Sequence, residues 1–488
     1  MSPPLEHEAG VPSGTSGGGY SRRVGLFSGV MLVIGGIIGS GIFLNPSIVA
    51  QRVHTPALTL GAWLLGGGVA LIGAFIYGEL GQRIPKAGGS YVYLRDAFGE
   101  LPAFLNAWGM LLMIATGAIA AVAVTFANYT LALTGLADGY RFPLAVGAIV
   151  LLSGINYFGV RPGALTQNVF TVLKLVALAV LVGAGLLLAG ASPSVGTTTP
   201  PAPPDSIVLA LGAALVPVLF SYGGWQQTNF VAEELVNPER NLPRALLWGV
   251  IGVVTVYLLA NLTYLRTLGA EGLAASNAPA ADALGLLLGP TGRTFITAGV
   301  ALSTFGFLNL VILVSPRVYQ AMAADGLFFP WMARLHPRYH TPSAAIVFQA
   351  VWAILLTSTG TYGELLDYVV FADWLVFGAT AATLFVYRAR ERQGQVPRVT
   401  YRVPGHPFTP LLFIAAALYV VVGSTASNPL NALKGTLLLG AGVPVFLYWR
   451  KRREARATAQ VSGTDVVEGP SVPEQPVRSA VSGKRGAD

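Results

Sequence analysis

The chain has 488 residues, of which 53% are hydrophobic and 11% charged, and its formal net charge is +8. Soluble globular domains usually carry about 25% charged residues, so this composition excludes an ordinary water-soluble protein. The chain contains no cysteine, which excludes disulfides, thiolate metal sites and cysteine nucleophiles.

Long apolar runs recur along the chain, and each approaches the length of about 20 residues that a helix needs to cross a bilayer. Hydropathy and helix-breaking residues predict about twelve such spans. We therefore expect an all-α polytopic membrane protein. The predicted spans cover residues 24–50, 57–84, 98–133, 143–158, 166–189, 207–235, 243–267, 294–324, 342–358, 365–388, 407–424 and 432–450.

Most lysine and arginine residues fall in the loops on one side of these spans. The loops on the other side carry only Arg52, Arg141, Arg266 and Arg293. The positive-inside rule predicts a multi-pass protein of the plasma or inner membrane with both termini in the cytoplasm. This topology requires an even number of spans. Because the basic charge follows the loops, it indicates orientation, and we expect no nucleic-acid partner. The basic side carries Arg22, Arg23, Arg83, Lys86, Arg95, Arg161, Arg240, Arg244, Arg334, Arg338, Arg388, Arg390, Arg392, Arg398, Arg402 and the run 450–453.

The first span contains the glycine-rich stretch GGIIGSGIF at residues 35–43. Glycine costs about 1 kcal/mol relative to alanine inside a helix, so this density predicts an interrupted helix. At bilayer depth the freed backbone groups must line a cavity enclosed by protein. The N–H groups of Ser40 and Gly41 would begin a second half-helix whose positive end suits a carboxylate. The carbonyls of Gly36 and Ile37 would suit an ammonium or Na⁺.

A second break is predicted in the sixth span, at residues 219–225 (LFSYGGW). The two breaks occupy corresponding positions in two halves of five spans, residues 22–190 and 205–392. Because five is an odd number, the second half enters the membrane from the opposite side. This inverted repeat is typical of secondary transporters, which bind substrate at the paired breaks.

Three further segments complete the predicted organisation. Residues 405–453 would add two spans after the repeats. Residues 1–21 and 454–488 are rich in Ser, Gly, Pro and charge, and are predicted to be disordered cytoplasmic tails.

Lys174 lies in the middle of the fifth span, where a charge costs about 2.5–3.5 kcal/mol unless it faces a cavity or a partner. We expect its ammonium to bind the freed carbonyls of Gly36 or Ile37 together with the hydroxyls of Ser303 and Thr304. A fixed positive charge would then stand where a sodium-coupled protein holds an ion. The lysine could also accept and release a proton.

Asp373 lies in the middle of the tenth span, in FADWLVF. Two interpretations are open: it reads the polar side chain of a substrate, or it is a protonated, hydrogen-bonded structural residue. The sequence has no HExxH, Walker, GxSxG or metal-ligand cluster, so we expect no enzyme activity, no cofactor and no metal site.

Residues 36–43 resemble the first-helix signature of the amino acid–polyamine–organocation (APC) superfamily. Residues 220–243 and 77–94 and the pair Asp373-Trp374 are similar to its L-type amino acid transporter (LAT) branch. The resemblance extends from about residue 22 to residue 390. It implies a leucine-transporter-like fold of five plus five inverted helices, with helices 1 and 6 broken and two helices appended.

The resemblance also implies roles for single residues. The substrate carboxylate would meet the backbone N–H groups of Ser40 and Gly41, and the substrate ammonium the carbonyls of Ile37, Phe220 and Gly223. Lys174 matches the lysine that replaces a sodium ion in sodium-independent members. The implied substrate-binding residues are Ile37, Gly39, Ser40, Gly41, Phe220, Gly223, Gln226, Phe307 and Trp374.

Two departures from the family pattern matter. Asp373 stands where close relatives often carry a neutral asparagine, and this departure argues against a strictly neutral substrate. Animal LAT proteins hold a glycoprotein heavy chain by a disulfide, and without cysteine we expect no such partner; the expected partners are a small amino acid and the lipid bilayer.

The leading hypothesis is a sodium-independent transporter of L-amino acids, neutral ones first, that works by alternating access as an exchanger or a proton-coupled importer. The alternative within transport is an antiporter of amines, polyamines or cationic amino acids. A non-transporting amino acid sensor is a distant third, because the chain has no long soluble domain.

Overall fold

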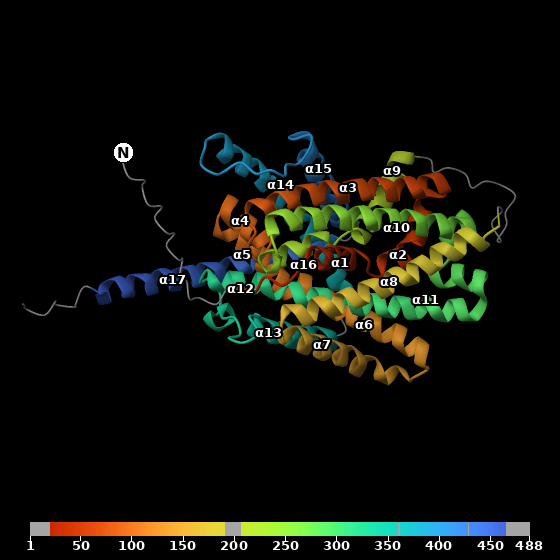
Figure 1. The fold of residues 1–488 in the computed structure, drawn as a ribbon, viewed down its shortest axis with the longest axis horizontal. Coiled ribbons are helices and arrows are strands. Elements are labelled where there is room, and N and C mark those ends of the chain that lie inside the picture. The colour runs from red at the N-terminus through yellow and green to blue at the C-terminus, as the bar shows by residue number, and fades with distance from the viewer. Residues whose placement is uncertain (1–19, 191–205, 360–361, 428, 465–488) are drawn as a thin grey trace, which may run out of the picture.

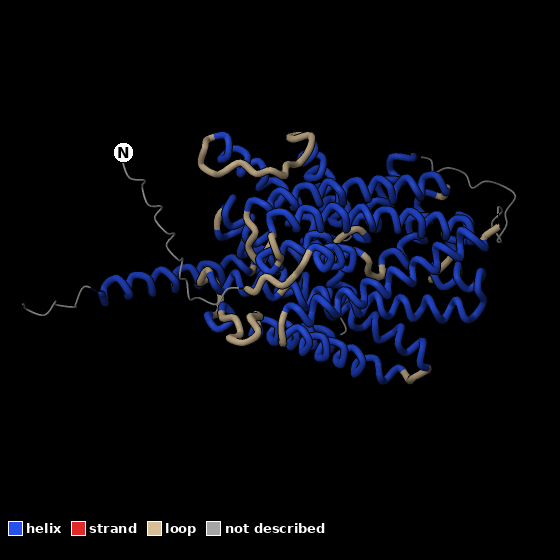
Figure 2. The backbone as a smooth tube through the Cα atoms, viewed as in Figure 1, coloured by secondary structure: helices blue, strands red, loops and turns tan. Residues whose placement is uncertain are grey.

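The computed structural model describes residues 20–190, 206–359, 362–427 and 429–464. These residues form helices joined by short loops, and they contain no β-strand apart from one isolated bridge between Val24 and Leu235. The long helices lie side by side along the long axis of the molecule (Figure 1), and loops are confined to the ends of the bundle and to a few interruptions within it (Figure 2). The predicted all-α class is confirmed.

The first half of the described chain is built from eight α-helices and two short helices of other types. A π-helix, η1 (Met110–Ile114), joins two of the α-helices, and a 3-10 helix, η2 (Asp138–Tyr140), precedes another. The α-helices are α1 (Leu26–Ile37), α2 (Gly41–Val53), α3 (Pro56–Arg83), α4 (Ser90–Phe98), α5 (Glu100–Gly109), α6 (Ala115–Thr134), α7 (Arg141–Tyr157) and α8 (Val160–Leu188).

The second half begins after the segment 191–205. Its 3-10 helices are η3 (Trp225–Glu234) and η4 (Pro330–Ala333). Its α-helices are α9 (Ile207–Ser221), α10 (Pro238–Ala275), α11 (Pro279–Val314), α12 (Pro316–Ala324), α13 (Ser343–Thr359), α14 (Tyr362–Arg392), α15 (Phe408–Ser427), α16 (Pro429–Gly440) and α17 (Gly442–Thr464).

Local sequence signals set many of these helix boundaries. Thr55 caps α3 by accepting a hydrogen bond from the N–H of Leu58, and Pro56 fills the first helical position, where its missing N–H is harmless. Gly135 ends α6 in the left-handed conformation that glycine adopts without strain.

Nine helical segments of the described chain are long and apolar enough to cross a membrane, and the pair α1 and α2, bent by 42°, would make a tenth. A polytopic membrane protein is therefore confirmed. The number of twelve spans and the five-plus-five inverted repeat stay predictions, since α13 is shorter and part of α14 lies outside the described side chains.

The last predicted span, residues 432–450, is not one continuous helix. The helix stops at Gly440 and restarts at Gly442, where a Cβ atom would lie 2.8 Å from the Trp108 ring. Helix α17 then continues to Thr464, beyond residue 453, so the first part of the predicted tail 454–488 is helical. The rest of that tail, from residue 465, and nearly all of the tail 1–21 lie outside the described residues.

One end of the bundle, called here the basic end, is tied together by arginine ion pairs. The backbone N–H groups of Arg23 and Val24 donate to the carbonyl of Glu234, which joins the start of α1 to the end of η3. The opposite end is called the far end. Ion pairs at the basic end join Glu79 to Arg83 and Arg388, Glu391 to Arg83 and Arg402, Asp325 to Arg95, Glu100 to Arg453 and Glu234 to Arg317.

Candidate functional site

The first transmembrane helix is interrupted between α1 and α2, as predicted. Helix α1 ends at Ile37, Ile38 leaves the helical conformation (φ −76°, ψ 89°), and α2 begins at Gly41. The first N–H groups of α2 therefore have no carbonyl within their own helix to bind, and they present a partial positive charge. Ser40 and Gly41 line a cavity at this point.

The second predicted break is also present, and it lies against the first. Helix α9 ends at Ser221, and η3 begins at Trp225 after Gly224, whose φ of 104° requires glycine. A Cβ on Gly224 would lie 2.2 Å from the carbonyl oxygen of Gly36, and a Cβ on Gly36 would lie 2.8 Å from the carbonyl oxygen of Gly224. The two interrupted backbones are thus in contact, and only glycine at both positions permits it.

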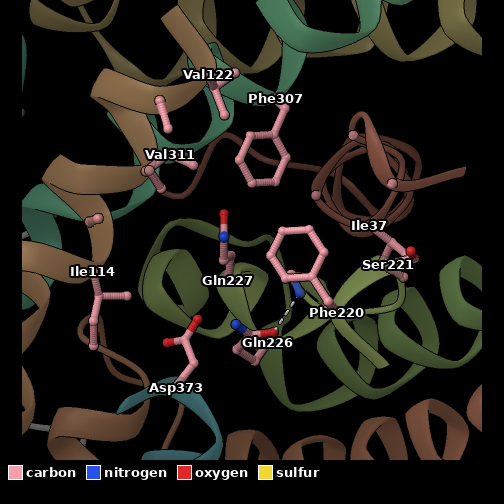
Figure 3. A pocket seen from close by; sticks show the side chains of 18 of the residues that line it. Ile37, Ile114, Val122, Phe220, Ser221, Gln226, Gln227, Phe307, Val311 and Asp373 are labelled. Carbon is pink, nitrogen blue, oxygen red and sulfur yellow. Dashed lines mark hydrogen bonds between the residues drawn. The ribbon is translucent and has the colours of Figure 1, made fainter. Parts of the chain in front are cut away.

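A cavity of about 280 Å³ lies at this junction. Figure 3 shows the rings of Phe220 and Phe307 projecting into it, with Ile114, Val122 and Val311 forming an apolar wall. The structure therefore brings together the residues singled out for substrate contact. The cavity lining includes Ile37, Gly39, Ser40, Gly41, Phe220, Gly223, Gln226, Thr304, Phe307, Asp373 and Trp374.

Asp373, Gln226 and Gln227 lie together on one side of the cavity (Figure 3). Asp373 is the only ionisable residue among the described residues that line the cavity. Gln226 uses its side-chain oxygen to accept the N–H of Gly224 at 3.0 Å. The side-chain oxygen of Gln227 is buried and accepts no hydrogen bond in the described structure. Sequence reasoning missed Gln227, although it directly follows Gln226.

Lys174 lies at the first break, but its partners differ from those expected. The fully buried ammonium donates to the carbonyls of Gly35 at 3.2 Å and Ile38 at 2.6 Å, not to those of Gly36 or Ile37. The reason is rotation about the helix axis: successive residues point about 100° apart, so only some carbonyls of the break face α8. Lys174 lies behind the break and does not line the cavity.

The carbonyl of Ile37 has a partner that the sequence did not suggest. The hydroxyl of Tyr257, on α10, lies 3.0 Å from the Ile37 oxygen and 3.2 Å from the Ser221 oxygen. Tyr257 thus bridges the carbonyl groups at which α1 and α9 end. A tyrosine in an apolar helix has no local signal for this role, because aromatic residues in such helices mostly pack.

The two hydroxyls expected beside Lys174 behave differently from each other. Ser303 Oγ lies 3.2 Å from the carbonyl oxygen of Ile38 and 3.3 Å from that of Gly39, so it joins Lys174 at the same backbone segment. Thr304 instead donates within its own helix, to the carbonyls of Val300 and Ala301. The expected hydrogen bonds of Lys174 to Ser303 and Thr304 are both absent, because its ammonium donates to the carbonyls of Gly35 and Ile38.

A buried row of polar side chains continues from Lys174 along α8 toward the basic end. Thr171 Oγ1 donates to the carbonyl of Met31 on α1 at 3.2 Å, and Gln167 Nε2 donates to Thr171 Oγ1 at 3.3 Å. Asn309, on α11, donates to Gln167 Oε1 at 3.0 Å. Side chains spaced three and four residues apart share one face of a helix, so α8 presents a continuous polar stripe to α1 and α11.

Buried ion pairs join helices at the basic end of the bundle. The carboxylate of Glu234, at the end of η3, pairs with the guanidinium of Arg317 at 2.8 Å, and both side chains are fully buried. Glu79 pairs with Arg83, one turn further along α3, and also with Arg388. Breaking such buried pairs costs several kcal/mol, so they are positions where opening of this end would be controlled.

Comparison with known proteins agrees with this architecture. Residues 24–440 match the family model described as Amino acid permease. The chain is 33% identical over 462 residues to the human large neutral amino acids transporter small subunit 2, covering 92% of this chain and 85% of that protein. It is 32% identical over 443 residues to the serine/threonine exchanger SteT of Bacillus subtilis (strain 168), covering 90% and 99%.

A further relative is the mouse b(0,+)-type amino acid transporter 1, which is 31% identical over 414 residues, covering 84% of this chain and 83% of that protein. The match to the family model spans both broken helices. The chain belongs to the amino acid permease family of the APC superfamily, and it is similar to the LAT-type transporters.

Proposed function

We propose that this protein is a sodium-independent secondary transporter of L-amino acids that works by alternating access, as an exchanger or with proton coupling. The observation that carries the proposal is the cavity at the junction of the two broken helices, which has backbone dipoles of opposite sign on its walls. Relatives named as amino acid transporters and as an exchanger support it.

The backbone of the cavity would hold the common part of every amino acid. The N-terminus of α2, at Ser40 and Gly41, would bind the α-carboxylate through N–H groups and the Ser40 hydroxyl. The carbonyls of Ile37, Phe220 and Gly223 would receive the α-ammonium. Because these are backbone groups, recognition of the zwitterion would not depend on the substrate side chain.

The position of Lys174 supports sodium independence. Its ammonium already donates hydrogen bonds to the carbonyls of Gly35 and Ile38, and the Ser303 hydroxyl bonds the Ile38 carbonyl as well. A cation bound at the same carbonyls would meet the like charge of the lysine at close range. The site therefore carries its own cation in place of a bound Na⁺.

Neutral amino acids are the substrates that the relatives' names favour, and the apolar wall formed by Ile114, Val122 and Val311 suits an apolar side chain. Asp373 favours a second candidate, an amino acid with a cationic side chain. The carboxylate of Asp373 and the side-chain oxygen of Gln227, which accepts no hydrogen bond, could both accept hydrogen bonds from such a side chain. No positively charged residue stands beside them in the described cavity lining. The mouse b(0,+)-type relative keeps this candidate open.

The orientation proposed places the basic end in the cytoplasm of a cell whose plasma or inner membrane the chain crosses, because arginine and lysine accumulate on the cytoplasmic side of membrane proteins. The transporter would act without a disulfide-linked heavy chain, since the sequence contains no cysteine. We propose no enzyme activity for this protein.

Uptake of a radiolabelled amino acid panel into proteoliposomes tests the function. We expect uptake of at least one neutral amino acid that is the same in sodium and choline buffers and is stimulated by amino acid inside the vesicles if the protein exchanges. Binding of amino acids without any uptake, under either a proton gradient or an internal amino acid load, would instead support a sensor.

A further inference from the structure

The helical segment Glu100–Thr134, which follows α4, is not regular along its length. Its middle turn, η1, is a π-helix, in which the N–H of Ala115 donates to the carbonyl of Met110, five residues earlier. Single π-turns inside α-helices are rare and occur frequently at functional sites. Met110 and Ile114, the first and last residues of η1, both line the cavity.

The π-turn allows one face of this segment to follow the cavity on both sides of the turn. Asn106, before the turn, and Val122, after it, both line the cavity and are sixteen residues apart. In a regular α-helix, with about 100° per residue, their side chains would point about 160° apart. Because a π-turn holds one extra residue, this difference falls to about 60°. The π-turn thus keeps Asn106 and Val122 on the face that lines the cavity.

The π-turn also takes the usual donor away from one backbone carbonyl, and a side chain supplies the replacement. In an α-helix the carbonyl of Leu111 would accept the N–H of Ala115, but that N–H binds the carbonyl of Met110 instead. The hydroxyl of Thr116 donates to the Leu111 carbonyl at 2.8 Å, and Thr116 is fully buried. Thr116 therefore satisfies the carbonyl whose helical partner the π-turn diverts.

Two further side chains reach η1 from other helices. The hydroxyl of Tyr319, on α12, donates to the carbonyl of Met110 at 3.2 Å, and Tyr319 is fully buried. The indole N–H of Trp352, on α13, donates to the carbonyl of Leu112 at 3.2 Å. Three consecutive carbonyls, those of residues 110–112, thus each accept a hydrogen bond from a side chain. Carbonyls inside a regular α-helix are already bonded to N–H groups of that helix, so these extra donors stabilise the π-turn.

The π-turn lies across the cavity from the helix breaks. Figure 3 shows Ile114, the last residue of η1, on the side of the cavity away from Ile37 and Ser221, at which α1 and α9 end. With the charged groups of an amino acid at the breaks, as proposed above, its side chain would extend toward η1. The methyl group of alanine is too short to use this wall, whereas the side chains of leucine and phenylalanine would pack against it.

We propose that η1 forms the side-chain end of the substrate cavity, and that Thr116, Tyr319 and Trp352 are positioning residues that fix η1 in place. None of the three lines the cavity, so each acts through the backbone of residues 110–112. Together they govern how the protein discriminates between amino acids by the size of the side chain. The proposal rests on the amino acid transport proposed above.

Competition against a labelled amino acid in proteoliposomes tests the proposal with two variants. The double variant Y319F/W352F removes the hydroxyl and the indole N–H but keeps two aromatic rings, and Thr116→Val removes a hydroxyl but keeps the side-chain shape. A neutral hydrogen bond shifts an equilibrium by about three- to tenfold, so the concentrations of L-leucine and L-phenylalanine that halve uptake should rise by this factor. The value for L-alanine should stay within about twofold.

Matched controls make the same chemical changes elsewhere. Tyr129→Phe, on α6, and Trp248→Phe, on the exposed side of α10, alter groups that donate no hydrogen bond to the described residues, and both should leave the size preference unchanged.

The absence of native cysteine allows the register of η1 to be read without any substrate. Ile114 lines the cavity, whereas its neighbour Met113 is buried and does not. A small water-soluble methanethiosulfonate should therefore label Ile114→Cys faster than Met113→Cys. The difference should shrink when Y319F/W352F is added to each single cysteine, because the turn is no longer fixed.

A parallel rise for L-alanine and L-leucine in the variants, or no rise for either, overturns the proposal. Equal labelling of Ile114→Cys and Met113→Cys without further substitution also overturns it. If Y319F/W352F does not fold, Thr116→Val alone decides the competition result. Absent uptake of every amino acid by the native protein contradicts the proposed function instead, and the labelling still tests the position of η1. The two failures are therefore distinguishable.

Discussion

The ammonium of Lys174 lies 2.6 Å from the carbonyl oxygen of Ile38, the residue that directly follows the end of helix α1. An interrupted helix leaves carbonyl groups without donors in a region where water cannot supply them. A lysine from α8 satisfies two of these groups with one charged side chain, and Ser303 from α11 reaches the same segment. Side chains from α8 and α11 therefore converge on the break in the first helix.

Replacing Lys174 with alanine should reduce transport strongly. The carbonyls of Gly35 and Ile38 would lose a charged donor, and each unsatisfied buried acceptor costs about 1–3 kcal/mol, so α1 should loosen and turnover should fall at least about tenfold. Native uptake should be identical in sodium and choline buffers, and any pH dependence carried by the lysine should flatten in the variant. Native uptake that sodium stimulates, or variant kinetics unchanged at every pH, would refute this role.

Replacing Gly41 with valine should abolish transport. A Cβ at Gly41 would lie 2.7 Å from the Ser221 hydroxyl oxygen and 3.1 Å from its Cα, so the side chain would push α2 away from α9 and crowd the predicted carboxylate site. Uptake by detergent-stable, membrane-inserted protein is the measurement. Gly61→Ala is the control, because a Cβ there meets nothing within 4 Å. Normal uptake by Gly41→Val would mean that the break is not the site.

Substrate analogues should separate recognition of the two charged ends from recognition of the side chain. An amine that lacks the α-carboxylate, or an N-acetyl amino acid, should compete less well than the parent amino acid, by up to about thirtyfold, because a helix terminus stabilises a charge by up to about 2 kcal/mol. Competition against a labelled substrate measures this loss. Equal competition by the decarboxylated amine would contradict the assignment of Ser40 and Gly41 to the carboxylate.

The variant Asp373→Asn should change selectivity with little change in shape. If the carboxylate binds cationic side chains, removing its charge should lower the competition of L-lysine or L-arginine by about tenfold, since a hydrogen bond to a charged group contributes about 1.5–3 kcal/mol. Competition by L-leucine should remain within about twofold. A parallel loss for lysine and leucine would assign Asp373 a structural role, and no loss for either would remove it from selectivity.

Much of the architecture could be predicted because it depends on local properties of the chain. Long apolar segments predicted a polytopic helical protein, since a helix is the way a single segment satisfies its backbone in lipid. The glycine clusters at 35–43 and 219–225 predicted both interruptions, and the cavity forms where they meet. The composition of α17 was less informative, because a charged helix and a disordered tail can share the same residues.

The detailed contacts depended on how the helices pack. Within the sequence, Gly35 and Gly36 are equivalent neighbours, yet the carbonyl of Gly35 faces Lys174 and Gly36 faces Gly224. Hydrophobicity and glycine content predict that a helix is interrupted, but they carry no information on the rotation of each helix about its axis. That rotation is decided when the helices pack together.

The sequence by itself thus determined the helical class, the positions of the two breaks and the residue types around the cavity, because each of these follows from residues close together in the chain. Only the tertiary structure decided that Tyr257 bridges the carbonyls of Ile37 and Ser221, and that Asn45 and Arg52 bind α9. The physical reason is that a hydrogen bond requires two groups within about 3 Å, and chain folding brings together donors and acceptors more than 30 residues apart in sequence.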